Sequence, residues 1–243
     1  LGHMFNMMVE NIRKLINEVY ITEIKFKEAQ FNALQAQINP HFLYNTLETI
    51  HFMIVIGDNR AVRMVQLLGD LFRVGIGKGE RFITVEQEVN HVRLYLEIQQ
   101  IRYSNKFKAV IDMSDEVNQL YLIKFVLQPI VENSIYHGIE LMEEDGLISI
   151  TGRIEDDKLM ICIMDNGIGM DENALSTLQD KLEGKIKTKG IGFTNVNERI
   201  RLNFGNEYGV YVESQENQGT KVTIWLPVIR ENPDTNEKDT LDH

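Results

Sequence analysis

Pro40 and His41 are the first neighbouring residues in this sequence whose types and order could do chemistry. They stand within residues 37–45, whose apolar spacing is helical, and a proline inside a helix removes a backbone donor at a cost of about 3 kcal/mol. Histidine has an unperturbed pKa of about 6.5, so its ring is largely neutral and nucleophilic at pH 7. A lone surface histidine is usually inert, so the pair marks His41 only as a candidate nucleophile.

Two stretches further along the chain predict part of a nucleotide site. Glu132 and Asn133 offer a carboxylate and an amide oxygen, which are hard ligands suited to Mg²⁺. Asp165 ends a predicted strand and is followed by Gly167 and Gly169, which let the backbone approach a flat ligand closely. Either stretch alone is a weak signal, because a Glu-Asn pair and a Gly-x-Gly turn are both common.

A third stretch completes this pattern. Gly190 and Gly192 open a predicted helix whose free amides and positive end favour phosphate. Residues 171–189, between the two glycine pairs, are interpreted as a mobile lid that orders when nucleotide binds. Thr220 opens the last predicted strand and is expected to place a hydroxyl near the pocket. The lid carries four lysines: Lys181, Lys185, Lys187 and Lys189.

Composition narrows the class of protein. The chain has 243 residues and a net charge of -11, which argues against nucleic acid as the main partner. No apolar run reaches the roughly 18 residues of a membrane span, and the start lacks the features of a signal peptide. Residues 1–4 resemble a cloning scar, so the natural protein is expected to continue upstream. Cys162, the only cysteine, is expected in the core.

The N-terminal elements must present His41. Apolar or small residues recur at alternating steps of three and four from Phe5 to Ile54, which predicts a long helix that pairs with its own copy. His41 lies just beside this seam and shares an outward strip with Asn45 and Glu48. Helical spacing resumes from Val62 to Gly75, which predicts a helical hairpin and a four-helix bundle in the dimer.

The rest of the chain must build the nucleotide site. Thr84 and Gln87 form a predicted capping box that opens a helix to Ile101, interpreted as a structural connector. Strand and helix patterns then alternate, which predicts an α+β sandwich. The predicted strands are 106–112, 147–154, 158–164, 210–215 and 220–227, and the predicted helices are 123–137 and 193–204.

Four motifs in order, at residues 34–48, 128–133, 165–169 and 190–196, resemble those of LytS/YesM-type sensor histidine kinases. The resemblance implies a dimerisation and phosphoacceptor bundle followed by a Bergerat-type (GHKL) ATP-binding α/β sandwich. It also implies the substrate ATP, Mg²⁺, a response regulator partner, and an upstream transmembrane sensor. The chain would then be the cytoplasmic portion of a cell-membrane protein.

The implied domains follow the motifs. Residues 1–35 are expected to form a signalling coiled coil, and residues 36–104 a homodimerisation and histidine phosphotransfer domain. Residues 105–230 are expected to bind ATP, and residues 231–243 to form a disordered acidic tail.

The resemblance also assigns roles to individual residues. His41 matches the autophosphorylated histidine, Asn133 the Mg²⁺ ligand, and Asp165 the acceptor of the adenine amino group. Gly167 and Gly169 match the first glycine box of the family, and Gly190 and Gly192 match the second. Glu132 is the further candidate metal ligand.

Two departures from the family pattern leave roles open. Many relatives have lysine where Tyr136 stands, so phosphate neutralisation falls to His137, the lid lysines or Arg199. Phe42 occupies the position that often holds an acid, so Asn45 is assigned an orienting role and the general base stays open.

Two other functions are compatible with a nucleotide fold alone. One is an ATPase of the GHKL type that works as a conformational clamp without a phosphohistidine, and the other is a catalytically silent dimeric scaffold. The exposed Pro40-His41 pair favours the kinase, because a clamp has no use for it.

Overall fold

The computed structural model describes residues 40–75, 80–142, 145–186 and 192–236. The chain divides into two compact units between Asp58 and Asn59, and each is described by itself. The described part of the first unit is helix α2, Pro40–Ile56. The predicted coiled coil before it lies outside the described residues. No helix in the described ranges is both long and apolar enough to cross a membrane.

Helix α2 presents His41 as the spacing predicted. His41 and Glu48 are exposed and Asn45 is half-buried. Of the predicted seam, Leu47 and Ile54 are exposed in this single chain, which suits residues meant for a second copy. Of the buried residues of α2, Ile50 belongs to that seam, whereas Phe42, Thr46 and Met53 do not.

The second unit begins with two packed helices, α3 (Arg60–Gly75) and α4 (Val85–Arg102). Met64 and Leu67 of α3 are fully buried. The capping box of α4 is confirmed, since Thr84 Oγ1 accepts from the Gln87 amide and Gln87 Oε1 accepts from the Thr84 amide.

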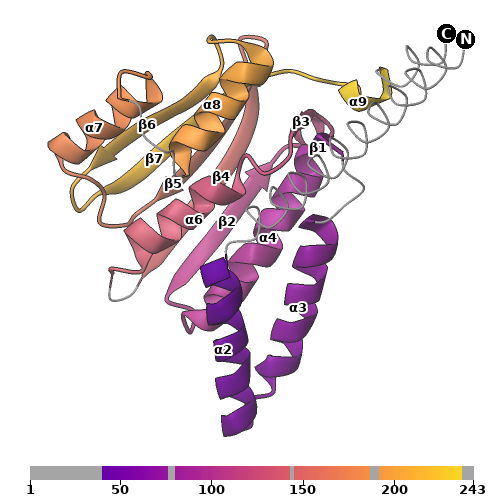
Figure 1. The fold of residues 1–243 in the computed structure, drawn as a ribbon, viewed down its shortest axis with the longest axis vertical. Coiled ribbons are helices and arrows are strands. Elements are labelled where there is room, and N and C mark those ends of the chain that lie inside the picture. Colours follow the sequence, from indigo (N-terminus) through magenta and orange to yellow (C-terminus); the bar gives the residue numbers. More distant parts are fainter. Residues whose placement is uncertain (1–39, 76–79, 143–144, 187–191, 237–243) are drawn as a thin grey trace, which may run out of the picture. The chain divides into compact units, whose positions relative to one another are not determined.

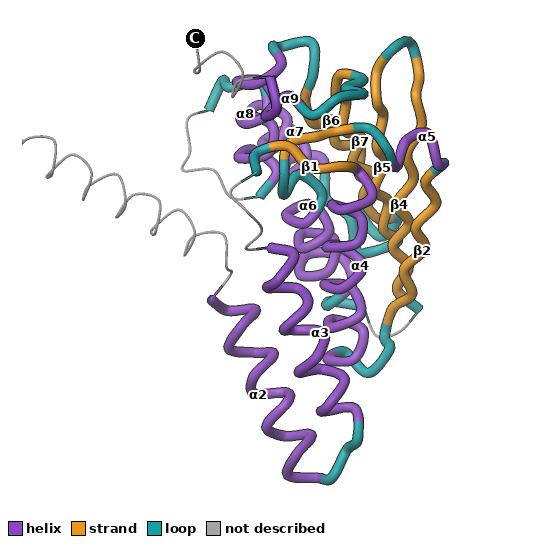
Figure 2. The backbone as a smooth tube through the Cα atoms, turned by 90° about the vertical axis from the view of Figure 1, so that its right-hand side faces the viewer, coloured by secondary structure: helices purple, strands orange, loops and turns teal. Residues whose placement is uncertain are grey.

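A five-stranded sheet forms one layer of this unit, with strand order β2-β4-β5-β7-β6. Strands β2 and β4 are parallel and every other neighbouring pair is antiparallel. The helices lie on one side of the sheet (Figure 1, Figure 2), so the predicted α+β sandwich is confirmed. The strand bounds are β2 Phe107–Met113, β4 Gly146–Glu155, β5 Lys158–Asp165, β6 Gly209–Gln215 and β7 Gly219–Pro227.

The helical layer contains α6 (Gln128–Asn133), α7 (Glu172–Leu182) and α8 (Phe193–Phe204). A π-helical segment, η1 (Ser134–Ile139), continues directly from α6. The two remaining short helices are α5 (Asp115–Asn118) and α9 (Pro233–Asn236).

The structure corrects the predicted helix 123–137. Residues Tyr121–Ile123 form strand β3, which pairs with β1 (Phe82–Thr84) in a separate two-stranded sheet. The helix starts only at Gln128, because Phe125 has a φ of 61°, which no helical residue can adopt, and Pro129 suits a first turn.

The chain after β7 is also built into the second unit. Asp234, expected in a disordered tail, accepts hydrogen bonds from the Arg81 and Phe82 amides at 2.9 and 3.1 Å. The Tyr121 amide donates to Ile229 O at 2.8 Å. The segment thus holds β1 and β3; residues 237–243 lie outside the described ranges.

Candidate functional site

A cavity of about 410 Å³ opens between the sheet and helices α6, α7 and α8. Five residues predicted from sequence line it: Asn133, His137, Asp165, Gly169 and Thr220. The other lining residues are Ser134, Gly138, Leu141, Ile168, Met170, Leu178 and Phe193. A mostly apolar wall with a few polar groups is what a planar base with a polar edge requires.

Asp165 is the buried anion of this cavity. It ends β5, opposite Thr220 of β7, and only 4% of its surface is exposed. Its Oδ1 accepts from the amides of Gly167 and Thr220 at 3.0 and 3.2 Å. Burial raises the pKa of Asp165, while hydrogen bonds from the Ser134 side chain and these two amides counteract the rise. The carboxylate is therefore fixed as an acceptor facing the cavity.

The first glycine pair permits close packing around Asp165. A Cβ on Gly167 would lie 2.4 Å from Gly138 Cα of η1. Gly169 has a φ of 64°, and a Cβ there would lie 2.0 Å from Gln215 O. No other residue fits either position without moving the backbone.

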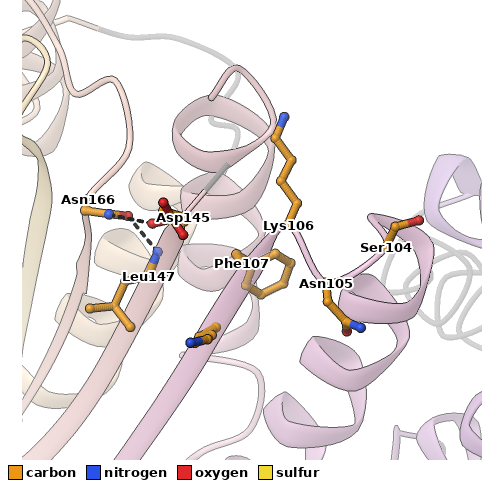
Figure 3. A pocket seen from close by; sticks show the side chains of 9 residues that line it. Ser104, Asn105, Lys106, Phe107, Asp145, Leu147 and Asn166 are labelled. Carbon is orange, nitrogen blue, oxygen red and sulfur yellow. Dashed lines mark hydrogen bonds between the residues drawn. The ribbon is translucent and has the colours of Figure 1, made fainter. Parts of the chain in front are cut away.

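Asn166, between these residues, turns away from the cavity. Its Oδ1 accepts from the Leu147 amide at 2.6 Å and its Nδ2 donates to Asp145 O at 2.9 Å (Figure 3). These bonds lie in a separate hollow beside the starts of β2 and β4. The side chain therefore fastens the loop before β4 and leaves the ligand to Asp165.

Asn133 meets the start of α8. Its Nδ2 donates to Pro129 O at 2.8 Å, which leaves Oδ1 as the free ligand atom of the amide. Gly192 has a φ of 67°, and a Cβ there would lie 2.4 Å from Asn133 Nδ2. Gly192 of the second glycine box therefore packs against the predicted metal ligand, and Lys189 and Gly190 lie outside the described residues.

The segment after Asn133 separates two sets of side chains. Ser134, His137 and Gly138 line the cavity, whereas the Tyr136 hydroxyl lies 3.5 Å from both Gln99 Nε2 and an Arg102 nitrogen. A π-helical turn changes the angular spacing of residues and is common at functional sites. Here the π-helical segment includes His137, whose side chain lines the cavity.

Glu132 does not line the cavity. Its Oε1 accepts from Gln128 Nε2 at 2.9 Å, so it belongs to the Gln128 side of α6. This geometry gives no support to Glu132 as a metal ligand.

Of the three sources considered for phosphate neutralisation, the structure places His137 at the cavity. Arg199 instead donates to Lys124 O and interacts with Glu88. Lys185 forms ion pairs with Asp180 and Glu183 at 3.0 and 2.6 Å. Arg199 is therefore structural, and His137 is the candidate phosphate donor among the described residues that line the cavity.

The predicted lid is partly a regular helix. Asp171 caps α7 by accepting from the Ala174 amide at 2.7 Å, and Leu178 of α7 lines the cavity. Part of the segment 171–189 thus forms an N-capped helix that lines one wall of the cavity, and its ordering on nucleotide binding stays a prediction. Lys187 and Lys189 lie outside the described residues.

The His41 ring has Asn45 as a close neighbour one turn along α2. Asn45 Nδ2 lies 3.3 Å from His41 Nδ1 and 3.1 Å from Nε2. Both side chains belong to the first unit, so their geometry stands apart from that of the cavity. The amide is within hydrogen-bonding distance of the ring and can select its tautomer.

Comparison with known proteins assigns the family. The family model described as "Histidine kinase" matches residues 29–107, and that described as "Histidine kinase-, DNA gyrase B-, and HSP90-like ATPase" matches residues 120–230. The chain is also 35% identical to sensor histidine kinase YesM of Bacillus subtilis (strain 168) over 95% of its own length. This chain belongs to the histidine kinase family. The two matched regions of this histidine kinase follow one another in the order predicted from its motifs.

Another relative is sensor protein kinase HptS of Staphylococcus aureus (strain USA300), 29% identical over 93% of this histidine kinase. The chain spans 39% of YesM and 44% of HptS. A catalytic domain of histidine kinase ThkA is 18% identical with a TM-score of 0.46, covering 62% of this chain and 97% of that domain.

Some site residues of this histidine kinase carried no usable sequence signal. Met170, Leu178 and Phe193 are apolar, and an apolar side chain facing a ligand has the same pattern as one facing a core. Ser134 and Gly138 could have been found, because they follow Asn133 at positions that a helical turn brings to the same side.

Proposed function

We propose that this chain transfers the γ-phosphoryl group of ATP to a ring nitrogen of His41 and relays it to an aspartate of a response regulator. The observation that carries the proposal is the occurrence, in one chain, of an exposed histidine on α2 and a cavity headed by a buried Asp165. Phosphoryl transfer of this kind depends on positioning and on neutralising charge.

The cavity selects adenine through Asp165. Two backbone amides and the Ser134 side chain donate to the Asp165 carboxylate, and the acceptor capacity that they leave would be directed at the ligand. An adenine amino group donates to such an acceptor. The glycines at 167 and 169 let the base lie against backbone.

The triphosphate would extend toward Asn133, His137 and the start of α8. Asn133 Oδ1 would hold Mg²⁺, since the amide nitrogen is already bonded to Pro129 O. When bound, the ion neutralises phosphate charge. His137 contributes a donor at the same wall, and Lys189, Gly190 and Gly192 are assigned to the phosphates.

The nucleophile must be a neutral imidazole with a lone pair on the attacking nitrogen and the proton on the other. Asn45 can hold that proton through its Oδ1, because rotating the amide by half a turn replaces Nδ2 by the acceptor. We assign Nε2 as the attacking atom and Asn45 as the orienting residue. Phe42 supplies no acid beside the ring.

The working form is a homodimer. Several apolar side chains of α2 are exposed in the single chain, including Leu47, Phe52, Ile54 and Val55. Such a strip is the material of a helix bundle. The full-length protein would add an upstream transmembrane sensor, and this chain would be its cytoplasmic portion.

A conformational-clamp ATPase is the alternative function. Incubation with γ-labelled ATP and Mg²⁺ separates the two, since the kinase retains acid-labile label on the protein and the clamp releases all label as phosphate. A matched test of the cavity is Asn133→Ala, which should weaken Mg²⁺-dependent ATP binding. Unchanged affinity would contradict the ligand role of Asn133.

A further inference from the structure

Helix α4 meets the α6–η1 segment through a polar seam, which we define as Glu88, His91, Tyr95, Gln99 and Arg102 of α4 with their partners. These five residues follow one another at steps of three or four, so they share one face of α4. Three hydrogen bonds across the seam join residues 37 positions apart, from 88 to 125, from 91 to 128 and from 99 to 136. The constant offset means that the two segments run in the same direction in one register.

The seam is anchored at its start by two buried side chains. Both carboxylate oxygens of Glu88 accept backbone amides at 2.9 Å, from Phe125 and from Leu127. His91 Nε2 lies 2.7 Å from Gln128 Oε1. Burial lowers the pKa of His91, so its ring is neutral and Nε2–H donates to Gln128.

Gln128 links His91 of α4 to Glu132, which directly precedes Asn133 at the end of α6. Its Oε1 accepts from His91 and its Nε2 donates to Glu132 Oε1 at 2.9 Å. Gln128, Glu132 and Tyr136 recur every four residues and face α4, whereas Asn133 and His137, each one residue later, line the cavity. A shift of α4 along the seam would therefore move Asn133.

The energetics favour a fixed register. Glu88 and Gln99 are fully buried and His91 is 4% exposed. Breaking a hydrogen bond of the seam would therefore leave a buried polar atom that water cannot reach. A buried polar group left unpaired in this way destabilises the folded state. The other side of α4 packs against α3, where Arg63 donates to both carboxylate oxygens of Glu97 at 2.9 and 3.1 Å. Helix α4 is thus tied to α3 on one side and to Asn133 on the other.

We propose that the polar seam sets the position of Asn133, so that α4 controls affinity for Mg²⁺-bound ATP through the positioning residues Gln128 and Glu132. The inference rests on the proposed function, in which Asn133 holds the ion. In this proposal Glu132 is a residue of the polar seam and not a ligand of the metal ion.

Reversing the donor and the acceptor of the Gln128–Glu132 hydrogen bond tests whether the polar seam positions Asn133. In Gln128→Glu, the new carboxylate still accepts from His91 but meets the Glu132 carboxylate where an amide donor stood. Adding Glu132→Gln restores one donor and one acceptor with the polarity reversed. The readout is the affinity of the whole chain for a non-hydrolysable ATP analogue by calorimetry, with Mg²⁺ and with EDTA.

The expected result is a loss of about tenfold in the Mg²⁺-dependent part of the affinity for Gln128→Glu, within the range of typical coupling energies. The affinity of the double variant should return to within about twofold of the parent's affinity. A difference of that size is within the error with which independent mutational effects add. Glu132→Gln alone keeps an acceptor for Gln128 and should also stay within about twofold. Exposed Gln119→Glu is the matched control and should change nothing.

Three results would overturn the proposal: a Gln128→Glu variant with unchanged Mg²⁺ dependence, a double variant without recovery, or a large loss for Glu132→Gln alone. The last would return Glu132 to the metal. Thermal melting of each variant separates loss of folding from loss of binding. Because binding is read without phosphorylation, a chain that binds Mg²⁺ and ATP as expected but never labels His41 would refute the proposed function and leave the seam intact.

Discussion

Replacing Asp165 by asparagine should exchange the base preference of the cavity. In the parent, Oδ1 accepts the Gly167 and Thr220 amides, so an asparagine can keep those bonds with its own oxygen. Its Nδ2 would then point where the carboxylate is proposed to accept the adenine amino group, and two donors would face each other. Losing a hydrogen bond to a charged acceptor costs about 1.5–3 kcal/mol, and an unpaired donor costs about 1–3 kcal/mol.

A combined loss of about 3 kcal/mol corresponds to roughly a hundredfold weaker ATP binding. Inosine triphosphate carries an oxygen in place of the amino group, so the new amide can donate to it and regain about 1 kcal/mol. Calorimetry with both nucleotides at pH 8 gives the ratio of their dissociation constants. Asp156→Asn, at the exposed β4–β5 turn, is the matched control. An Asp165→Asn variant with the parent's ratio of ATP to inosine triphosphate affinity would refute the assignment of Asp165 to the base.

Three further changes test the scaffold around the site. Gly192→Ala places a Cβ 2.4 Å from Asn133 Nδ2, so Mg²⁺-dependent ATP affinity should fall by about tenfold or more, and an unaltered affinity would contradict this packing. Burial lowers the pKa of His91 in the folded state relative to the unfolded chain. As pH falls below about 6.5, the unfolded state therefore binds a proton before the folded state does. The free energy of unfolding then falls by at most about 1.4 kcal/mol per pH unit. Urea unfolding at pH 7.5 and 5.5 should show less acid loss for His91→Gln than for the parent, and equal loss would count against a buried neutral ring. Thr84→Ala breaks the capping box with Gln87 and should cost about 1 kcal/mol, or about 2–4 °C in melting temperature, whereas an unchanged midpoint would show that the cap contributes nothing.

The sequence predicted most of the sheet and the helices that have regular periodicity. Strand β5 and helix α8 fall within one residue of their predicted bounds, because apolar runs and a glycine start fix them. Strand β3 was missed because three residues are too few to show alternation, and its pairing with β1 depends on a partner about 40 residues away.

The site was predictable where chemistry depends on residue type. Asp165 and Asn133 were identified because the Glu-Asn pair and the two glycine pairs, each common alone, occur together in one chain, and both residues line the cavity. Gln128, by contrast, is an ordinary polar residue in sequence, and only the distances to His91 and Glu132 reveal that it links two helices. Tertiary contacts of this kind leave no period in the chain.

Phosphorylation of His41 by ATP can be tested by mapping the residue that carries the label. The whole chain is incubated with γ-labelled ATP and Mg²⁺, and the parent is compared with His41→Gln for label that is lost in acid and kept in alkali. We expect such label on His41 in the parent, none in His41→Gln, and equal ATP affinity in both. Label that persists in His41→Gln, or a parent that hydrolyses ATP without becoming labelled, would contradict it.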